Sequence, residues 1–476
     1  MLRSNIRKEN QIPEGYLMSK SIAILGAGES GIGAAILGLK HGYRVFLSDA
    51  GVVSDDRKAM LQSHGIDFES GGHTKSKILA ADEVVKSPGI PDTAPLILEL
   101  IAQGTPVISE IEFAYRYIPQ GAKVVAITGT NGKTTTTLLT HHLLKSAGLN
   151  VALGGNVGIS LAKLVAEGGY DYYVVEVSSF QLDGIIQFKP DVAVLLNITP
   201  DHLDRYEYDF NKYVASKFRI LENLTDEEAF VYCADSEPIT EELARRKVQA
   251  CLFAISTSNN PKWQAYMSDE HLVFNYKFKH IVKNHQIPVS EIALIGKHNM
   301  INAMSAVLTA LQFDVSIEVI SKGLKNFVNA PHRLEPCGQI DGVKFINDSK
   351  ATNVDAVFYA LEGIKSDIIW IAGGIDKGND YLQLDDLVEK KVKGLVCLGK
   401  DNTKLKKHFG PILNQIEETE SIGQAVEMAL GMASKGDVVL LSPACASFDL
   451  FRNYEDRGDQ FRASVKLLSN KKTTKV

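Results

Sequence analysis

Residues 124–137, VVAITGTNGKTTTT, are the feature that most constrains the fold of this chain. An apolar run that predicts a β-strand leads into a glycine-containing turn, and Lys133 and Thr134 then open a predicted helix. In such a unit, backbone N–H groups approach phosphates, the lysine supplies a positive charge and the threonine hydroxyl can bind Mg²⁺. The usual pattern, G-x-x-x-x-G-K-[ST], would place its first glycine at Ile127, whereas the first glycine here is Gly129. We therefore predict a shortened phosphate-binding loop in an α/β domain.

The composition narrows the classes of protein that could carry this loop. A chain of 476 residues with 45% hydrophobic and 23% charged residues is long enough for two or three globular domains. A net charge of -6 argues against a nucleic-acid scaffold, which needs a broad basic surface. No apolar run is long enough to span a bilayer, and the five cysteines form no C-x-x-C pair, so we expect a cytoplasmic protein without disulfides or zinc. We interpret residues 1–19 as a disordered leader, with Met18 as an alternative start.

The first block, residues 20–117, begins with a strand, a glycine turn, a helix and a second strand: SIAILGAGESGIGAAILGLKHGYRVFLSD. The turn G-A-G-E-S-G fits the pattern G-x-G-x-x-G, and Asp49 follows at the interval of a ribose-binding acid. Taken alone, this suggests NAD. The glycines mainly indicate a tight turn, however, and any nucleotide diphosphate could use them.

The central block, residues 118–328, contains the apolar runs KVVAIT, YYVVEVSSF and DVAVLLNIT, each ending in polar residues. Ligands of parallel sheets bind at that edge, so Glu176 and His202 are expected beside the phosphate loop as contacts for Mg²⁺ or Mn²⁺. Lys217 lies in an amphipathic helix and, by itself, is interpreted as a solvated lysine. In a helix beginning near position 298, Asn299 and Asn302 point the same way and could bind a base, or Asn299 could cap the helix.

The third block, residues 329–476, contains the strands VKFINDS, DIIWIAGG, GLVCLG and DVVLLSPA alternating with helical segments. This order predicts a second doubly wound α/β domain. Its strand ends and turns gather cations and hydroxyls that suit an anionic co-substrate. The residues concerned are Arg333, Asp348, Lys350, Thr352, Lys377, Ser447 and Arg457.

In order along the chain, GTNGKTTT, NITPDHLDR, GKHNMINAMSA, PHRLE and NDSKATN resemble the motifs of the Mur ligases, ATP-dependent amide-forming enzymes of peptidoglycan precursor synthesis. Within the family, EVSSFQL, SPGIP and SPACASFDLFRNYEDRGDQF are most similar to the members that add D-glutamate to UDP-N-acetylmuramoyl-L-alanine. The resemblance implies three domains. They are an N-terminal Rossmann-like domain for the UDP moiety, a central P-loop ATPase-like domain, and a C-terminal doubly wound Rossmann-like domain for the amino acid.

The resemblance also implies roles for individual residues. ATP would be held by Gly129, Thr130, Asn131, Gly132, Lys133, Thr134, Thr135, Asn302, Arg333 and Asp348. The UDP substrate would contact Gly28, Ser30, Gly89, Asn156 and Ser178, and D-glutamate would contact Thr352, Lys377, Ser447 and Tyr454. The metal would be bound by Thr134, Glu176, His202 and a carbamylated Lys217, with Lys133, His202 and Lys217 serving catalysis.

Two positions depart from the family pattern. No arginine follows the second strand in LSDAG, so the contact for the uracil is not predicted, and Tyr454 stands where the family often has phenylalanine. Four alternatives stay open: a sibling ligase with another acceptor, a folylpolyglutamate synthetase, an NAD-dependent oxidoreductase, and a nucleotide-binding protein without catalysis. For the ligase, we expect a monomer that binds small-molecule substrates and neither nucleic acid nor membrane.

Overall fold

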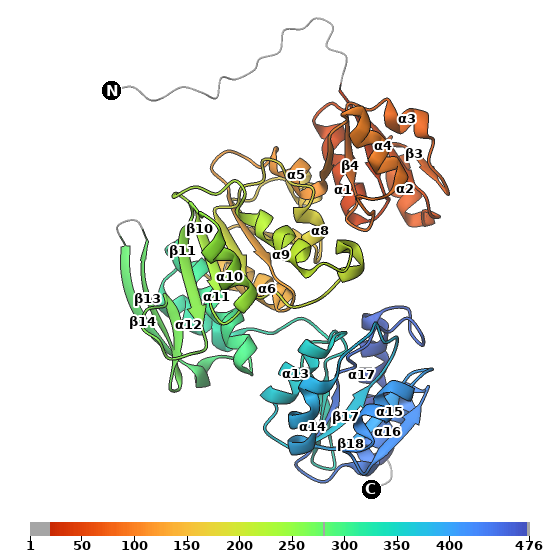
Figure 1. The fold of residues 1–476 in the computed structure, drawn as a ribbon, viewed down its shortest axis with the longest axis vertical. Helices are drawn as coiled ribbons and strands as arrows, with labels where there is room; N and C mark the ends of the chain where they lie inside the picture. The colour runs from red at the N-terminus through yellow and green to blue at the C-terminus, as the bar shows by residue number, and fades with distance from the viewer. Residues whose placement is uncertain (1–19, 279–280, 474–476) are drawn as a thin grey trace, which may run out of the picture.

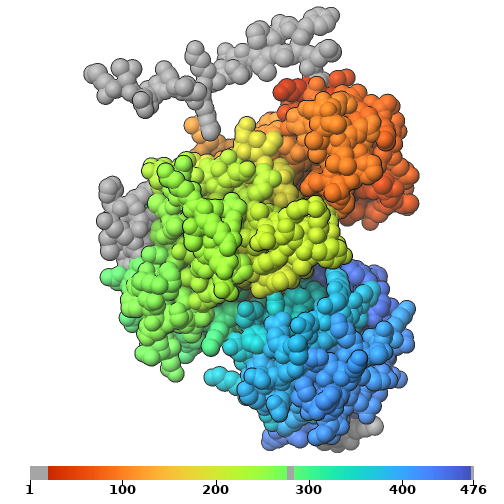
Figure 2. Space-filling view, in the orientation of Figure 1, coloured from red at the N-terminus to blue at the C-terminus, as the bar shows by residue number. Residues whose placement is uncertain are grey.

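The computed structural model describes residues 20–278 and 281–473, which form three α/β domains, each built on its own sheet (Figure 1). The predicted fold class is thereby confirmed. The central domain lies between the other two (Figure 2). The predicted leader and Met18 lie outside the described residues. None of the helices in the described part of the chain has the length and apolar content that a bilayer crossing requires.

The N-terminal domain has a five-stranded parallel sheet in the order β3-β2-β1-β4-β5. The order reverses at β1, so the glycine turn after β1 lies where open parallel sheets bind ligands. Gly26 has φ 98°, and a Cβ there would lie 2.4 Å from Ser87 Oγ, so the turn requires glycine. The elements are β1 (Ser21–Leu25), α1 (Glu29–Lys40), β2 (Arg44–Asp49), α2 (Asp55–Ser63), β3 (Asp67–Ser70), α3 (Lys75–Leu79), β4 (Glu83–Lys86), α4 (Pro95–Gln103), β5 (Val107–Ser109) and α5 (Glu110–Tyr115).

The central domain has a nine-stranded sheet in the order β14-β13-β12-β11-β10-β9-β6-β8-β7, in which only the β12–β13 and β13–β14 pairs are antiparallel. Here the order reverses at β6, the strand that leads into the phosphate loop. The elements are β6 (Lys123–Thr128), α6 (Lys133–Ser146), β7 (Val151–Gly155), α7 (Leu161–Glu167), β8 (Tyr172–Glu176), α8 (Ser179–Leu182), β9 (Val192–Leu195), η1 (Leu203–Tyr206), α9 (Phe210–Phe218), η2 (Arg219–Leu221), β10 (Ala229–Cys233), α10 (Glu237–Arg245), β11 (Cys251–Ser256), β12 (Ala265–Ser268), β13 (His271–Phe278), β14 (Ile281–Pro288), η3 (Val289–Glu291), α11 (Lys297–Gln312) and α12 (Ile317–Asn326).

The C-terminal domain has a six-stranded sheet in the order β15-β16-β20-β17-β18-β19, of which only the β15–β16 pair is antiparallel. Two buried clusters, one on each face of the sheet, form its core. The elements are β15 (Glu335–Ile340), β16 (Val343–Asn347), α13 (Val354–Gly363), β17 (Ile368–Ala372), η4 (Leu382–Leu384), α14 (Asp385–Lys391), β18 (Val392–Leu398), α15 (Thr403–Phe409), β19 (Ile416–Thr419), α16 (Ile422–Met432), β20 (Val438–Leu441) and α17 (Tyr454–Thr473).

The N-terminal and central domains share one hydrophobic core, which runs from Ile22 in β1 to Phe230 in β10. Within it α1 packs against α7 so closely that a Cβ on Gly33 would lie 2.0 Å from Ser160 Oγ. A side chain at position 33 would therefore separate the two helices. The two sheets are consequently held in one orientation relative to each other.

A buried carboxylate strengthens the contact between the N-terminal and central domains. Glu112 of α5 is fully buried, and its Oε2 accepts the backbone N–H groups of Ile186, Gln187 and Phe188 in the central domain at 2.8–2.9 Å. Its Oε1 accepts Arg116 Nε at 3.2 Å. The negative charge is thus satisfied by three central-domain donors and one cation of its own domain, as a buried charge requires.

Glu112→Gln should lower the free energy of unfolding by about 3 kcal/mol, because it removes the buried charge that these donors share. Glu83→Gln is the matched control, since Glu83 also accepts Arg116, at 2.9 Å, but within the described part of the chain it makes no hydrogen bond to the central domain. That control should cost about 1 kcal/mol. Urea unfolding of both variants measures the difference, and equal losses would contradict the role of Glu112 as an interdomain anchor.

Candidate functional site

The loop between β6 and α6 has the predicted strand–loop–helix geometry. Gly129 has φ 152° and Gly132 φ 84°, and a Cβ on Gly132 would lie 2.4 Å from Asn302 Oδ1. Both glycines are therefore required by the backbone. Lys133 Nζ donates to the carbonyls of Gly129 and Thr130, both at 2.8 Å, so the lysine lies folded over its own loop.

Glu176, at the end of β8, lies beside the loop as predicted. Its Oε2 accepts Thr134 Oγ1 at 2.7 Å and its Oε1 accepts Asn156 Nδ2 at 2.9 Å. His202 follows β9 with φ 52°, and burial is the main cause that lowers the pKa of its imidazole. A carboxylate, a hydroxyl and an imidazole thus gather at one edge of the central sheet.

Lys217 is 2% exposed, so its interpretation as a solvated lysine is wrong. Its Nζ contacts Thr128 Oγ1 at 3.3 Å and lies 5.1 Å from the centre of the Tyr213 ring. Among the described residues, it forms no ion pair with a carboxylate. Burial, with a further contribution from Lys133, places the pKa of Lys217 well below its ordinary value.

The two asparagines of α11 face the loop. Asn302 Oδ1 accepts Thr136 Oγ1 at 3.1 Å, and its Nδ2 donates to Asn299 Oδ1 at 2.9 Å. Asn299 Nδ2 in turn donates to the carbonyl of Ile295 at 2.7 Å. The capping alternative for Asn299 is wrong, because the helix begins at Lys297 and Gly296 occupies the N-cap without a side-chain bond.

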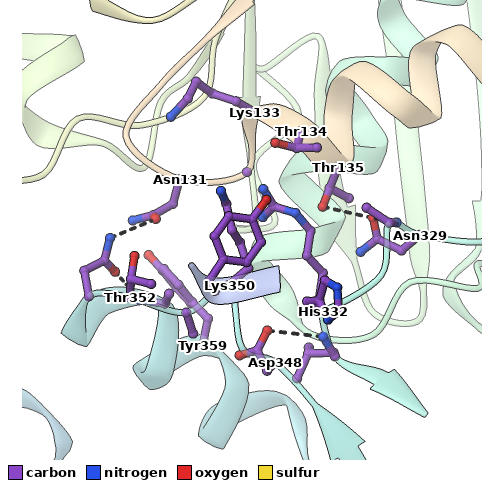
Figure 3. Close-up of a pocket in the computed structure, with 18 of the residues that line it drawn as sticks. Asn131, Lys133, Thr134, Thr135, Asn329, His332, Asp348, Lys350, Thr352 and Tyr359 are labelled. Carbon is purple, nitrogen blue, oxygen red and sulfur yellow. Dashed lines mark hydrogen bonds between the residues drawn. The ribbon is translucent and has the colours of Figure 1, made fainter. Parts of the chain in front are cut away.

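A cavity of about 570 Å³ lies between the central and C-terminal domains (Figure 3). Asn353 Nδ2 donates to Asn131 Oδ1 and Thr135 Oγ1 to Asn329 Oδ1, both at 3.3 Å, so hydrogen bonds join its walls. The predicted residues that line it are those from Thr130 to Thr135, Asn156, Glu176, His202, Asn299, Asn302, Arg333, Asp348, Lys350, Thr352 and Tyr454.

The backbone around Arg333 is unusual. His332 has φ 64° and Leu334 φ 47°, conformations that non-glycine residues rarely adopt. Each is held by a carboxylate: His332 N–H donates to Glu335 Oε2 at 2.8 Å and Leu334 N–H to Asp348 Oδ1 at 3.2 Å. Such strain is common at functional sites, and here it directs Arg333 to the cavity wall.

Burial shifts the pKa values of the charged side chains that line the cavity. It raises the pKa of Asp348 to about 7 and lowers that of Lys350 to about 8, the latter with help from Arg333. It also lowers the pKa of Lys133 and of Arg333. Each shift has desolvation as its main cause, which means that the cavity walls hold these charged groups away from water.

The remaining predicted C-terminal residues do not line the cavity. Ser447 is buried and Lys377 is exposed, on two neighbouring loops. Arg457, also among the predicted cations, is 1% exposed and donates to the carbonyls of Ser349, Gly373 and Cys445 at 2.9–3.3 Å. It therefore ties together the ends of three strands instead of binding an anion.

Of the predicted UDP-substrate residues, Asn156 lines the cavity, whereas Gly28, Ser30, Gly89 and Ser178 do not. Gly28 precedes α1 and has open space beside it, Ser30 lies in the first turn of α1, and Ser178 caps α8 through Gln181. Asp49 accepts the Ala27 N–H at 2.6 Å, so it supports the glycine turn.

Sequence reasoning missed Arg205, whose guanidinium crosses from η1 to the N-terminal domain. It donates to the carbonyls of Pro88, Gly89 and Ile90 at 3.1–3.3 Å and lies over the Phe180 ring at 4.4 Å. The DHLDRY motif contains it, but nothing in a single sequence indicates a partner 116 positions away. Gly89 is thereby linked to the segment that carries His202.

No group of three or more His, Cys, Asp or Glu side chains that could hold a metal occurs in the described ranges. The residues at the edge of the central sheet nevertheless fit Mg²⁺, which is usually bound by one or two carboxylates together with substrate phosphates. Glu176 and Thr134, 2.7 Å apart beside the phosphate loop, are such a set.

Three family models match the chain. They are the MurD N-terminal domain over residues 21–95, the Mur ligase middle domain over 127–310, and the Mur ligase, glutamate ligase domain over 332–445. The UDP-N-acetylmuramoylalanine--D-glutamate ligase of Christiangramia forsetii is 51% identical over 456 residues, covering 95% of this chain and 100% of that protein. The enzyme of the same name from Cytophaga hutchinsonii is 51% identical, covering 94% and 99%.

Solved structures of low identity share the fold. MurC from Thermotoga maritima gives a TM-score of 0.58 at 18% identity, covering 94% of this chain and 99% of that chain. MurF from Acinetobacter baumannii gives 0.59 at 16% identity, covering 93% of both. Together with the family models and the close relatives, they confirm the resemblance seen in the motifs. The chain belongs to the Mur ligase family.

Proposed function

We propose that this protein is the ATP-dependent ligase that joins D-glutamate to UDP-N-acetylmuramoyl-L-alanine, releasing ADP and phosphate. The observation that carries the proposal is the cavity in which the phosphate loop faces the cationic wall of the C-terminal domain. The names of relatives that are about half identical over nearly the whole chain support the choice of substrates. We expect the enzyme to act as a monomer in the cytoplasm, in peptidoglycan precursor synthesis.

The chemistry requires activation, because a carboxylate oxygen is a poor leaving group and an amine is mostly protonated near neutral pH. In the proposed route, a carboxylate oxygen of the L-alanyl group forms a bond to the γ-phosphorus of ATP while the bond to the ADP oxygen breaks. The amine of D-glutamate then attacks the acyl carbon, phosphate leaves and the nitrogen loses a proton. Lys133 would stabilise the charge on the transferred group, an electrostatic role common in phosphoryl transfer.

We propose the following roles for the other predicted residues. Asn302, Arg333 and Asp348 would hold ATP, and Thr134, Glu176 and His202 would hold Mg²⁺ or Mn²⁺, which neutralises phosphate charge when bound. The UDP substrate would contact Gly28, Ser30, Gly89, Asn156 and Ser178. D-glutamate would contact Thr352, Lys377, Ser447 and Tyr454.

We further propose that Lys217 is carbamylated. An ammonium at this buried position would repel a metal near Glu176, whereas the neutral amine reacts with carbon dioxide to give an anionic oxygen ligand. The absence of a carboxylate partner among the described residues and the lowered pKa support the neutral amine. The modification would reverse the sign of the charge beside Thr128.

The first prediction tests the substrates. ADP release should require both UDP-N-acetylmuramoyl-L-alanine and D-glutamate, because the amine completes the turnover. Omitting each substrate in turn, and replacing D-glutamate by a panel of amino acids, separates this function from a sibling ligase or a folylpolyglutamate synthetase. Full activity with another amino acid would reject the assignment, and nucleotide binding without ADP release would indicate a non-catalytic protein.

A second prediction concerns Lys133→Ala, which should lower turnover by about 10²- to 10³-fold, since it removes a positive charge from the phosphate loop. Binding of the UDP substrate, measured by calorimetry, should change little, because its proposed contacts do not include Lys133. Lys123→Ala is a suitable control: Lys123 begins the same strand but pairs with Asp191 at 2.8 Å near the surface. Normal turnover of Lys133→Ala would exclude its catalytic role.

A third prediction concerns Lys217→Arg, which keeps a cation but cannot form the carbamate, and should therefore lose most activity. With ¹³C-bicarbonate, the wild-type protein should give a carbamate ¹³C NMR signal that this variant lacks. Bicarbonate depletion should lower wild-type activity reversibly. Normal activity of Lys217→Arg, or a wild-type spectrum without the carbamate signal, would show that Lys217 is not modified.

A further inference from the structure

We propose that Asp376 is a positioning residue for amino-acid binding: with Lys404 it fixes the loop of residues 373–381 so that Lys377 remains unpaired and available to the anionic co-substrate. The inference rests on the proposed function, in which Lys377 contacts the amino acid. It adds two residues, Asp376 and Lys404, that neither touch the cavity nor belong to the predicted site.

Both oxygens of the Asp376 carboxylate accept hydrogen bonds from donors of the same domain. Its Oδ1 accepts the backbone N–H groups of Gly378 at 2.7 Å and Asn379 at 2.9 Å, and Lys404 Nζ at 3.1 Å. Its Oδ2 accepts the hydroxyl of Tyr381, a residue 1% exposed, at 2.8 Å. Four donors therefore hold the Asp376 carboxylate in place: two backbone N–H groups of the loop, the hydroxyl of buried Tyr381, and Lys404 of α15.

The same loop is tied to the loop that carries Ser447. Ile375 and Ala446 exchange two backbone hydrogen bonds at 2.8 and 3.2 Å, and Asn379 Nδ2 donates to the carbonyl of Ala444 at 3.0 Å. The two segments that hold proposed contacts for the amino acid are therefore one rigid unit. Through Lys404, the Asp376 carboxylate also links this unit to α15.

Lys377, the next residue, has the opposite environment. It is exposed and, within the described residues, has neither a hydrogen bond nor an ion pair. A carboxylate freed at position 376 would lie one residue from this ammonium and would compete with an anionic co-substrate.

Asp376→Ala should raise the KM for D-glutamate about tenfold, the loss expected for charge-assisted hydrogen bonds that fix a binding group. Both kcat and the KM for ATP should stay within about twofold. Lys404→Met should raise the KM for D-glutamate about threefold by the same reasoning. Lys406→Met is the matched control on α15, because Lys406 pairs with Glu418 at 2.9 Å and should leave every constant unchanged.

The decisive comparison is a double variant. If Asp376 acts through Lys377, then Lys377→Ala should raise the KM for D-glutamate, and adding Asp376→Ala should change it by less than about twofold. If the KM of the double variant rose by the product of the two single effects, or if the KM for ATP rose equally, the proposal would be overturned and general damage to the domain would be indicated. Tyr381→Phe, which removes one donor only, provides the same comparison if Asp376→Ala folds poorly.

Failure of the positioning role can be distinguished from failure of the proposed function. Wild-type ADP release that does not depend on D-glutamate rejects the function, and the KM comparison is then made with the amino acid that supports release. Wild-type dependence on D-glutamate together with an unchanged KM in Asp376→Ala rejects the positioning role alone.

Discussion

The burial of several cations in and behind the wall of one cavity is the constraint on which this site depends. Removing a cation from water is costly unless an anion or several acceptors replace the water. In the cavity wall and directly behind it, burial lowers the pKa of each cation in this set: Lys133, Lys217, Arg333 and Lys350. The carboxylates that line the cavity are Glu176, Asp201, Asp348 and Glu455, and burial raises the pKa of Asp348 to about 7. A polyphosphate in the cavity would replace the water that these cations have lost, and the donors are already in place to receive it.

The sheets explain why these charges meet. In the central domain, the phosphate loop, Glu176 and His202 follow three adjacent parallel strands, β6, β8 and β9, so they emerge at one edge. In the C-terminal domain, Asp348 follows β16 and accepts Ser442 Oγ, beyond β20, at 2.9 Å. The strained backbone at His332 and Leu334 then brings Arg333 between the two edges. Two ordinary sheet edges, placed face to face, are sufficient to build the cavity.

Most structural features that depend on local sequence patterns could be predicted. The three domains, the phosphate loop, the edge position of Glu176 and the joint orientation of Asn299 and Asn302 follow from periodicity and glycine placement. Strands β3, β15 and β19 were not predicted, because they are short or rich in polar residues and lie at sheet edges. The contacts of Arg205 and Glu112 could not be predicted either, since they join segments that only the tertiary fold brings together. The burial of Lys217 is of the same kind: helical spacing identified the apolar face but not that the lysine lies beneath the sheet edge.

The core that α1 and α7 share has a consequence for how such proteins can diversify. A crossover between genes near position 117 would join sheets that had not adapted to each other, and a residue larger than glycine opposite Ser160 would keep the helices apart. A crossover after α12 cuts no shared core, because the C-terminal domain has its own buried clusters. Recombination can therefore exchange the C-terminal domain as a module, whereas the first two domains must be inherited together.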